Sequence, residues 1–437
     1  MKSIDLLLSA RWIITVNPEN AVLDHHAVAI DNGRILDILP DVEAERQYRA
    51  DRRHDFDQHA LIPGLINTHT HVAMSLFRGL ADDLPLMEWL EQHIWPAEGR
   101  WVKEGFVKTG TELAIAEMLR GGTTCFNDMY FFPDVTAKVA DLAGIRATVG
   151  MILIDFPTVW AKDADEYLKK GLAVNDNYRN HERIRTAFAP HAPYTVSDTP
   201  LERVQMLAEE LDCRIHMHIH ETAFEVESFH KETGIRPLQR LEKLGLLGPR
   251  LLAVHMTQLT DGEIQTLARN GVSVVHCPES NLKLASGFCP TAALSRAEVN
   301  IALGTDGAAS NNDLDMLGEM RTAALIAKAH SQDASALPAA EALRMATING
   351  ARALGIDDET GSLEIGKAAD IAAIDLSRLE TQPIYDPVSA IVYAASREQI
   401  TDVWVAGEPL LKNRELTRMD IAQLQSEAQS WQHRIAP

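Results

Sequence analysis

The feature that most constrains the fold is the regular alternation of apolar, strand-like runs with helical patterns between residues 59 and 365. Such alternation is typical of βα units, whose strands lie parallel in one sheet. Eight candidate strands with helical connections predict a (β/α)8 TIM-like barrel, which gathers the groups at its strand ends on one rim. These strands end at His69/His71, Asn127/Asp128, Met151, His191, His218, His255, His276 and Asp306.

The two ends of the chain have a different pattern, in which short β-rich runs alternate with turns. In the N-terminal part Asn32-Gly33 separates two such runs, which is a strong hairpin signal. Similar runs return at 370–375 and 403–408. We expect residues 1–58 and 366–437 to form one small β-sandwich domain around a barrel of residues 59–365. An open doubly wound α/β sheet is the alternative, but no GxGxxG follows the first barrel strand.

Composition excludes two classes of partner. The chain has 437 residues with 41 basic and 62 acidic side chains, a net charge of −21, which would repel nucleic acid and anionic membranes. No apolar run approaches the roughly 18 residues of a membrane span. Asp5 interrupts any signal-peptide pattern, so we expect a cytoplasmic protein. The cysteines form no CxxC pair and are predicted to be buried free thiols: Cys125, Cys213, Cys277 and Cys289.

A histidine pair ends the first barrel strand. His69 and His71 are separated by one residue, and alternation along a strand points both imidazoles to the same face. In a chain with 17 histidines such a pair alone is a weak metal signal, and a core or solvated role is the ordinary alternative. The pair therefore needs further ligands on neighbouring strands.

The fifth, sixth and eighth barrel strands supply those further groups. The fifth carries His216, His218 and His220 within an apolar run, and burying so many imidazoles without a ligand is costly. The sixth ends at His255 and the eighth at Asp306. Nitrogen ligands with one carboxylate suit Zn²⁺ or Fe²⁺, so the pattern predicts a metal site at the rim.

These motifs resemble the amidohydrolase superfamily, and within it the cytosolic deaminases and chlorohydrolases. The resemblance rests on Pro63-Gly64-Leu65-Ile66-Asn67-Thr68-His69-Thr70-His71, on His218-Ile219-His220-Glu221 and on Gly304-Thr305-Asp306-Gly307, and it spans nearly the whole chain. It implies metal binding by His69, His71, His218 and Asp306 and catalysis by Glu221, His255 and Asp306. His216 and His220 are then neighbours of the site, although three histidines at spacing two leave the choice open.

The resemblance also implies the number of metals. Many superfamily members hold two metals bridged by a carboxylated lysine late in the fourth strand, but no lysine occurs between Lys170 and Lys231. One divalent ion, Zn²⁺ or alternatively Fe²⁺, is therefore expected. Such a site resembles the branch that displaces ammonia from a heterocyclic ring, with Glu221 protonating the ring nitrogen, His255 steadying the nucleophile and Asp306 accepting its proton.

A long segment after the first strand points to the substrate. Residues 74–98 resemble the same segment of 5'-methylthioadenosine/S-adenosylhomocysteine deaminases, which implies that Glu98 binds the ribose hydroxyls and that His191 contacts the nucleoside. Glu221 and Asp306 also face the substrate in that family. No arginine lies between Arg146 and Arg179 to hold an amino-acid tail. We therefore expect 5'-methylthioadenosine to be preferred over adenosine and S-adenosylhomocysteine.

Two alternatives stay open. A guanine- or triazine-type aminohydrolase or chlorohydrolase would use the same barrel, but Glu98 would then have no sugar to bind. A catalytically silent scaffold is the alternative from another class, although every ligand and acid/base position is filled. The expected partner is a small-molecule nucleoside. Barrels of the amidohydrolase superfamily commonly form pairs, so the resemblance implies a homo-oligomer, either a dimer or a tetramer.

Overall fold

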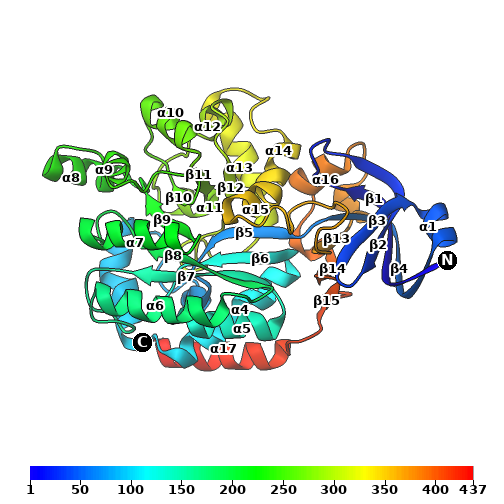
Figure 1. Ribbon diagram of the computed structural model, residues 1–437, viewed down its shortest axis with the longest axis horizontal. Helices are drawn as coiled ribbons and strands as arrows, with labels where there is room; N and C mark the ends of the chain where they lie inside the picture. The colour runs from blue at the N-terminus through cyan, green and yellow to red at the C-terminus, as the bar shows by residue number, and fades with distance from the viewer. Residues whose placement is uncertain (437) are drawn as a thin grey trace.

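The computed structural model describes residues 1–436, and its larger part is a barrel of parallel strands with helices outside (Figure 1). The strands follow one another around the sheet in chain order. The predicted (β/α)8 barrel is confirmed. Its strands are β5 (Leu65–Thr70), β6 (Thr123–Asp128), β7 (Arg146–Leu153), β8 (Ile184–Pro190), β9 (Arg214–Ile219), β10 (Leu251–His255), β11 (Ser273–His276) and β12 (Ile301–Leu303).

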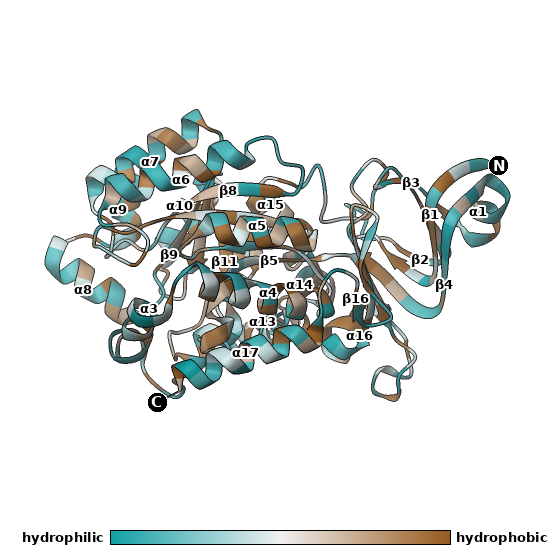
Figure 2. Cartoon of the chain, turned by 90° about the horizontal axis from the view of Figure 1, so that it is seen from below, coloured by the Kyte–Doolittle hydropathy of each residue, from teal (hydrophilic) through white to brown (hydrophobic). Residues whose placement is uncertain are grey.

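Helices cover the outside of the barrel and present polar faces to solvent, which Figure 2 shows in teal. Helix α10 begins with a capping box in which Thr260 and Glu263 bond each other's backbone N–H. The barrel helices are α4 (Glu104–Arg120), α5 (Pro133–Ala143), α6 (Ala164–Tyr178), α7 (Asp198–Glu210), α8 (Ala223–Thr233), α9 (Pro237–Lys243), α10 (Asp261–Asn270), α11 (Pro278–Lys283), α12 (Thr291–Arg296), α13 (Met316–Ser331), α14 (Ala339–Met345) and α15 (Ile348–Leu354).

Four short helical segments form a lid after β5. They carry the chain from the first barrel strand to the first long outer helix, α4. They are η1 (Val72–Phe77), α2 (Leu86–Glu88), η2 (Trp89–Ile94) and α3 (Trp95–Trp101). None of the lid's residues between 72 and 101 belongs to a strand, so the segment can lie across the open end of the barrel.

The two ends of the chain form a second sheet beside the barrel (Figure 1). Trp404 is 1% exposed and packs in one apolar cluster with Leu6, Val28 and Ile371, so strands from both termini share a core as predicted. The strands are β1 (Lys2–Ile14), β2 (Val22–Asp31), β3 (Arg34–Pro40), β4 (Tyr48–Pro63), β13 (Ile371–Asp375), β14 (Ile400–Val405), β15 (Glu408–Lys412) and β16 (Glu415–Leu416), with α1 (Asp41–Gln47) after β3.

The C-terminal segment returns to the barrel after the second sheet. Helix α17 (Ile421–Ile435) lies along α4 (Figure 2), where the Trp431 ring packs 5.3 Å from that of Phe106. Helix α16 (Pro387–Tyr393) likewise packs against α14. Parts of 366–437 thus contact the barrel, and the boundaries at 58/59 and 365/366 stay a prediction.

Two further expectations concern cysteines and membranes. All four cysteines are buried and unpaired, as predicted. Within residues 1–436, none of the helices combines the length and the apolar character that a bilayer crossing requires.

The barrel closes where β12 meets β5. The backbone N–H of Asp306 donates to the His69 carbonyl at 3.0 Å, and the Thr68 hydroxyl donates to the Leu303 carbonyl at 2.6 Å. A Cβ at Gly304 would lie 2.7 Å from the His69 nitrogen, so only glycine allows the two chains to approach this closely. The same contact that closes the barrel therefore sets the first and last strands of the site beside each other.

A buried ion pair joins the barrel to the second sheet. Arg146 on β7 lies 2.5 Å from the carboxylate of Asp370, whose side chain is fully buried. Asp370 also accepts hydrogen bonds from the Ala406 backbone N–H and from Thr360. Burial opposes the charge of Arg146, but Asp370 raises its pKa, so the cation persists at all ordinary pH values.

We predict that Arg146→Met lowers the free energy of unfolding by about 3–5 kcal/mol, because it leaves the Asp370 carboxylate buried without its counterion. Chemical denaturation followed by circular dichroism measures this. The matched control is Arg203→Met, which breaks an exposed pair with Asp165 and is expected to cost at most about 1 kcal/mol. Equal losses in the two variants would contradict a structural role for the buried pair.

Candidate metal centre and active site

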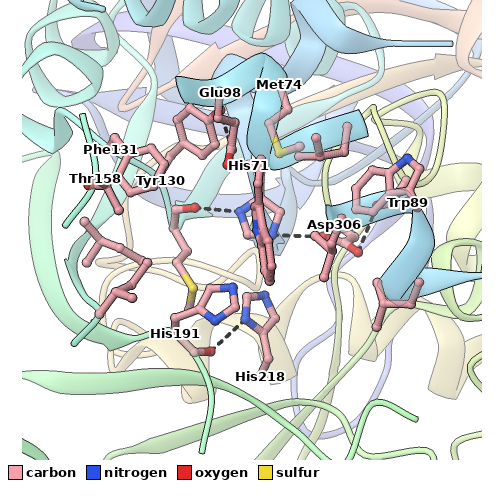
Figure 3. A pocket seen from close by; sticks show the side chains of 18 of the residues that line it. His71, Met74, Trp89, Glu98, Tyr130, Phe131, Thr158, His191, His218 and Asp306 are labelled. Atoms are coloured by element: carbon pink, nitrogen blue, oxygen red, sulfur yellow. Dashed lines mark hydrogen bonds and ion pairs between the residues drawn. The ribbon is translucent and has the colours of Figure 1, made fainter. Parts of the chain in front are cut away.

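A cavity of about 240 Å³ opens at the carboxyl ends of the barrel strands. Its floor comes from strand ends and its wall from the lid, and Figure 3 shows histidines and carboxylates projecting into it. His69 lies directly behind the floor and is fully buried. The structure thus brings together the predicted metal ligands, acid/base residues and substrate contacts. Those lining the cavity are His71, Glu98, His191, His218, Glu221, His255 and Asp306.

Four side chains converge on one point at the floor. The Nε2 atoms of His69 and His71 each lie 3.2 Å from Oδ1 of Asp306. The Nε2 atom of His218 lies 3.2 Å from that of His69. Three imidazole nitrogens and one carboxylate oxygen therefore face a common centre, which is the donor set that Zn²⁺ and Fe²⁺ accept.

The Nδ1 atom of each of these histidines makes a polar contact on the side of the ring that faces away from the centre. This leaves each Nε2 free to turn its lone pair inward, an arrangement typical of metal-binding histidines. The residues present therefore fit a divalent cation. The contacts are His71 Nδ1 to the Met129 carbonyl at 2.6 Å, His218 Nδ1 to the His191 carbonyl at 2.8 Å, and His69 Nδ1 to His216 Nε2 at 2.8 Å.

His255 lies close enough to join the same cluster. With His69 and His218 it forms a second group of three ligand atoms, all within 4.8 Å of one another. Its Nδ1 lies 2.9 Å from the amide oxygen of Asn281, which leaves Nε2 facing Glu221 Oε2 at 3.8 Å. The geometry thus places His255 between the metal centre and the predicted acid.

Asp306 is fixed by two hydroxyls. Ser280 and Ser310 donate to its Oδ2 at 2.7 and 2.9 Å, while Oδ1 faces the histidines. Burial opposes ionisation, but the bonds from His69 and His71 outweigh it and hold the pKa of Asp306 well below its usual range. The side chain is therefore a carboxylate, able to bind a cation or to accept a proton.

Two residues of the floor adopt a backbone conformation that side chains disfavour. Asp306 has φ +63° and His255 has φ +73°, in the left-handed region. Such residues cost about 1–3 kcal/mol each and cluster at functional sites, where neighbouring structure enforces them. The strain places both side chains at the cavity floor instead of in the strand direction.

Glu221 lies beside the metal centre at the start of the segment after β9. Burial raises the pKa of its carboxyl group, so that the neutral acid is favoured compared with an exposed glutamate. Its backbone N–H donates to the carboxylate of Glu225 at 2.7 Å, which fixes the turn. A carboxyl group with a raised pKa inside a cavity is suited to exchange a proton with a substrate.

Glu98 comes from the lid rather than from a barrel strand. It projects from α3 into the cavity and accepts a hydrogen bond from the Tyr130 hydroxyl at 2.8 Å (Figure 3). Enclosure by the cavity walls raises the pKa of Glu98 to about 7, although the bond from Tyr130 lowers it. Sequence reasoning missed Tyr130, because a tyrosine two residues after a strand carries no distinctive pattern.

His191 occupies the opposite wall. Its Nδ1 lies 3.0 Å from the Thr195 hydroxyl, and its ring lies 5.0 Å from that of His218. Burial lowers the pKa of His191 to about 3, so the ring is neutral and has one nitrogen that donates a hydrogen bond and one that accepts. It can therefore contact a polar, uncharged ligand.

Known proteins share this chain's sequence and architecture. A solved adenosine deaminase from Xanthomonas campestris with bound zinc is 56% identical, with 99% of each chain covered and a TM-score of 0.98. A relative from Saccharophagus degradans named 5-methylthioadenosine/S-adenosylhomocysteine deaminase is 52% identical, over 99% of this chain and 97% of its own.

A more distant structure shares the fold alone. An atrazine chlorohydrolase from Arthrobacter aurescens complexed with zinc is 24% identical with a TM-score of 0.92, over 98% of this chain and 99% of its own. Residues 60–410 match the Amidohydrolase family. That match covers most of the chain, including all eight barrel strands, and the chain belongs to the amidohydrolase family.

Proposed function

We propose that this chain is a metal-dependent hydrolytic deaminase that converts the 6-amino group of 5'-methylthioadenosine to the 6-oxo product and releases ammonia. Adenosine and S-adenosylhomocysteine are its weaker substrates. The observation that carries the proposal is that Glu98, whose carboxyl group can accept hydroxyl hydrogen bonds, shares one cavity with the histidines and Asp306. The names of the relatives that cover nearly the whole chain support the same reaction.

In this proposal His69, His71, His218 and Asp306 hold one divalent ion. The neighbour with bound zinc supports Zn²⁺, and Fe²⁺ suits the same ligands. Such an ion lowers the pKa of a coordinated water to about 7, which provides hydroxide at neutral pH.

The remaining steps belong to side chains of this chain. Glu221 gives its proton to the ring nitrogen next to the carbon under attack, which prevents negative charge from building on the ring. Asp306 accepts the proton of the attacking water, and His255 steadies the nucleophile through Nε2. The proton on Asp306 then passes to the amino group, which leaves as ammonia, while the new hydroxyl returns a proton to Glu221 and becomes the 6-oxo group.

The wall of the cavity supports a short apolar 5' substituent. Phe156 and Val159 line it beside Ile154, Leu90 and Trp95. Among the described residues that line the cavity there is no lysine or arginine. A charged amino-acid tail would lose its hydration there without gaining a counterion.

The other two functions have less support. A guanine or triazine substrate has no sugar, so Glu98 would have no substrate hydroxyl to bind and only that of Tyr130 beside it. A silent scaffold would not need three histidines with Nε2 turned to one centre. We find no observation that favours either function.

We also infer that the chain works in the cytoplasm as a homo-oligomer, a dimer or a tetramer. Four buried cysteines without a disulfide suit a reducing compartment. The oligomer rests on the family resemblance.

We predict that the zinc-loaded protein deaminates 5'-methylthioadenosine with a higher kcat/KM than S-adenosylhomocysteine. Ammonia release and the ultraviolet change from adenine to hypoxanthine measure both reactions. Chelation of the metal is expected to abolish turnover, and zinc to restore it. No conversion by protein with demonstrably bound metal would refute the deaminase, whereas faster turnover of S-adenosylhomocysteine would refute only the preference.

We predict that Glu98→Gln raises KM for 5'-methylthioadenosine roughly 10- to 100-fold, since a hydrogen bond to a charged group contributes about 1.5–3 kcal/mol. Steady-state kinetics measures the change. Free adenine, which has no ribose, is expected to react equally in both proteins. The control is Glu91→Gln, an exposed lid residue that does not line the cavity. An unchanged KM in Glu98→Gln would contradict ribose binding.

The pH dependence of KM provides a separate prediction. The pKa of Glu98 is about 7, so its carboxylate becomes protonated as the pH falls through neutrality and accepts hydroxyl bonds less well. KM for 5'-methylthioadenosine is therefore expected to rise below about pH 7 and to level off above it. Glu98→Gln removes the titrating group, and persistence of the same rise in that variant would assign it to another residue.

A further inference from the structure

A second pair of polar side chains lies directly beneath the metal centre, inside the barrel. His216 on β9 points to the interior, like His218 two residues later, and is fully buried. Its Nε2 lies 2.8 Å from Nδ1 of His69, and its Nδ1 lies 3.1 Å from the side-chain amide of Asn127 on β6. The role of His216, which the sequence left open, is thus to contact a metal-facing histidine from behind.

The position of the hydrogen on the His69 ring determines whether His216 donates or accepts in this contact. The Nε2 atom of His69 faces Asp306 and His218 at 3.2 Å, so it is the atom turned to the centre. An imidazole that binds a cation through Nε2 carries its single hydrogen on Nδ1. His216 Nε2 is the atom that lies within hydrogen-bond distance of that Nδ1, so His216 must accept this hydrogen bond.

Asn127 then determines whether His216 can accept. If His216 takes a hydrogen bond at Nε2, its own hydrogen lies on Nδ1 and needs an acceptor on Asn127. The amide oxygen of Asn127 is buried without a partner, whereas Nδ2 faces both His216 and the Thr68 carbonyl. A half-turn of the amide exchanges the two atoms, so that the oxygen accepts the His216 N–H and the hydrogen bond from Nδ2 to the Thr68 carbonyl is given up.

The opposite hydrogen arrangement is incompatible with a cation. If Asn127 Nδ2 donates to His216, the hydrogen of His216 moves to Nε2 and is donated to His69 Nδ1. His69 then carries its hydrogen on Nε2, and that nitrogen has no lone pair for a metal. The two arrangements of these three side chains therefore differ in whether His69 can act as a ligand.

We propose that His216, oriented by Asn127, is the positioning residue that keeps His69 in the form with a free Nε2 for the metal. The proposal rests on the metal centre proposed above. The rings of the two other proposed histidine ligands, His71 and His218, are held by carbonyl oxygens of Met129 and His191, which can only accept. Of these three proposed ligands, His69 is the one held by a side chain, so a substitution can remove its partner.

The test is the zinc affinity of the full-length protein, measured by competition with a chromophoric chelator. His216→Leu has a similar volume but no acceptor, and we expect it to bind zinc about 10- to 100-fold more weakly. His216→Gln places a carbonyl oxygen near His69 Nδ1 and is expected to recover most of the affinity. Asn127→Asp, which can only accept from His216, is expected to keep it.

His276→Leu is the matched control. This histidine also ends a barrel strand and is 2% exposed, and its Nδ1 has no hydrogen-bond partner. We expect its loss to leave zinc affinity unchanged while disturbing the interior to a similar degree. Thermal unfolding of the metal-free variants shows whether each is folded. If His216→Leu does not fold, the zinc affinities of His216→Gln and Asn127→Asp test the proposal instead.

Three outcomes would overturn the inference. His216→Leu could bind zinc as tightly as the wild type, His276→Leu could lose as much affinity, or His216→Gln could bind no better than His216→Leu. A wild-type protein that binds no zinc at all would instead refute the metal centre, so the two failures are distinguishable. Because affinity is measured without substrate, the identity of the nucleoside does not affect the result.

Discussion

The hydrogen-bonding needs of buried imidazoles govern the catalytic end of this barrel. A buried polar group without a partner costs about 1–3 kcal/mol, and four histidines converge at the floor of one cavity. Each has its Nδ1 held by a fixed partner, so each Nε2 turns inward. A cation is the ligand that satisfies several such nitrogens at once. The cluster is therefore costly without a metal and favourable with one.

Closure of the barrel provides the second constraint. The ligands come from the first, fifth and last strands, which meet only if β12 lies against β5. Gly304 allows that approach, and the backbone bond from Asp306 to His69 locks two ligand-bearing segments together. Because the left-handed backbone of Asp306 is strained, the carboxylate reaches the centre only while this closure holds. Fold and metal site are thus mutually dependent.

The sequence predicted the features that follow a local periodicity, such as strands, but not the contacts between segments that lack one. Strand runs ending in histidine or acid are visible residue by residue, and all eight barrel strands lie where the pattern placed them. The groups that support the site residues follow no spacing rule: Asn127 contacts His216, Asn281 contacts His255 and Ser280 contacts Asp306. The packing of α17 against α4 was also missed, because the pattern of an amphipathic helix does not indicate which element its apolar face contacts.

In the proposed function, the barrel supplies the metal-facing groups and the lid supplies the carboxylate that binds the sugar. The metal-facing residues lie on or directly after β5, β9, β10 and β12, whereas Glu98 lies on a short helix outside the sheet. A change in the lid can replace the carboxylate proposed to bind ribose without moving a proposed ligand. In the proposed function, specificity therefore depends on Glu98 and the apolar wall, while the chemistry depends on partners buried beneath the strand ends.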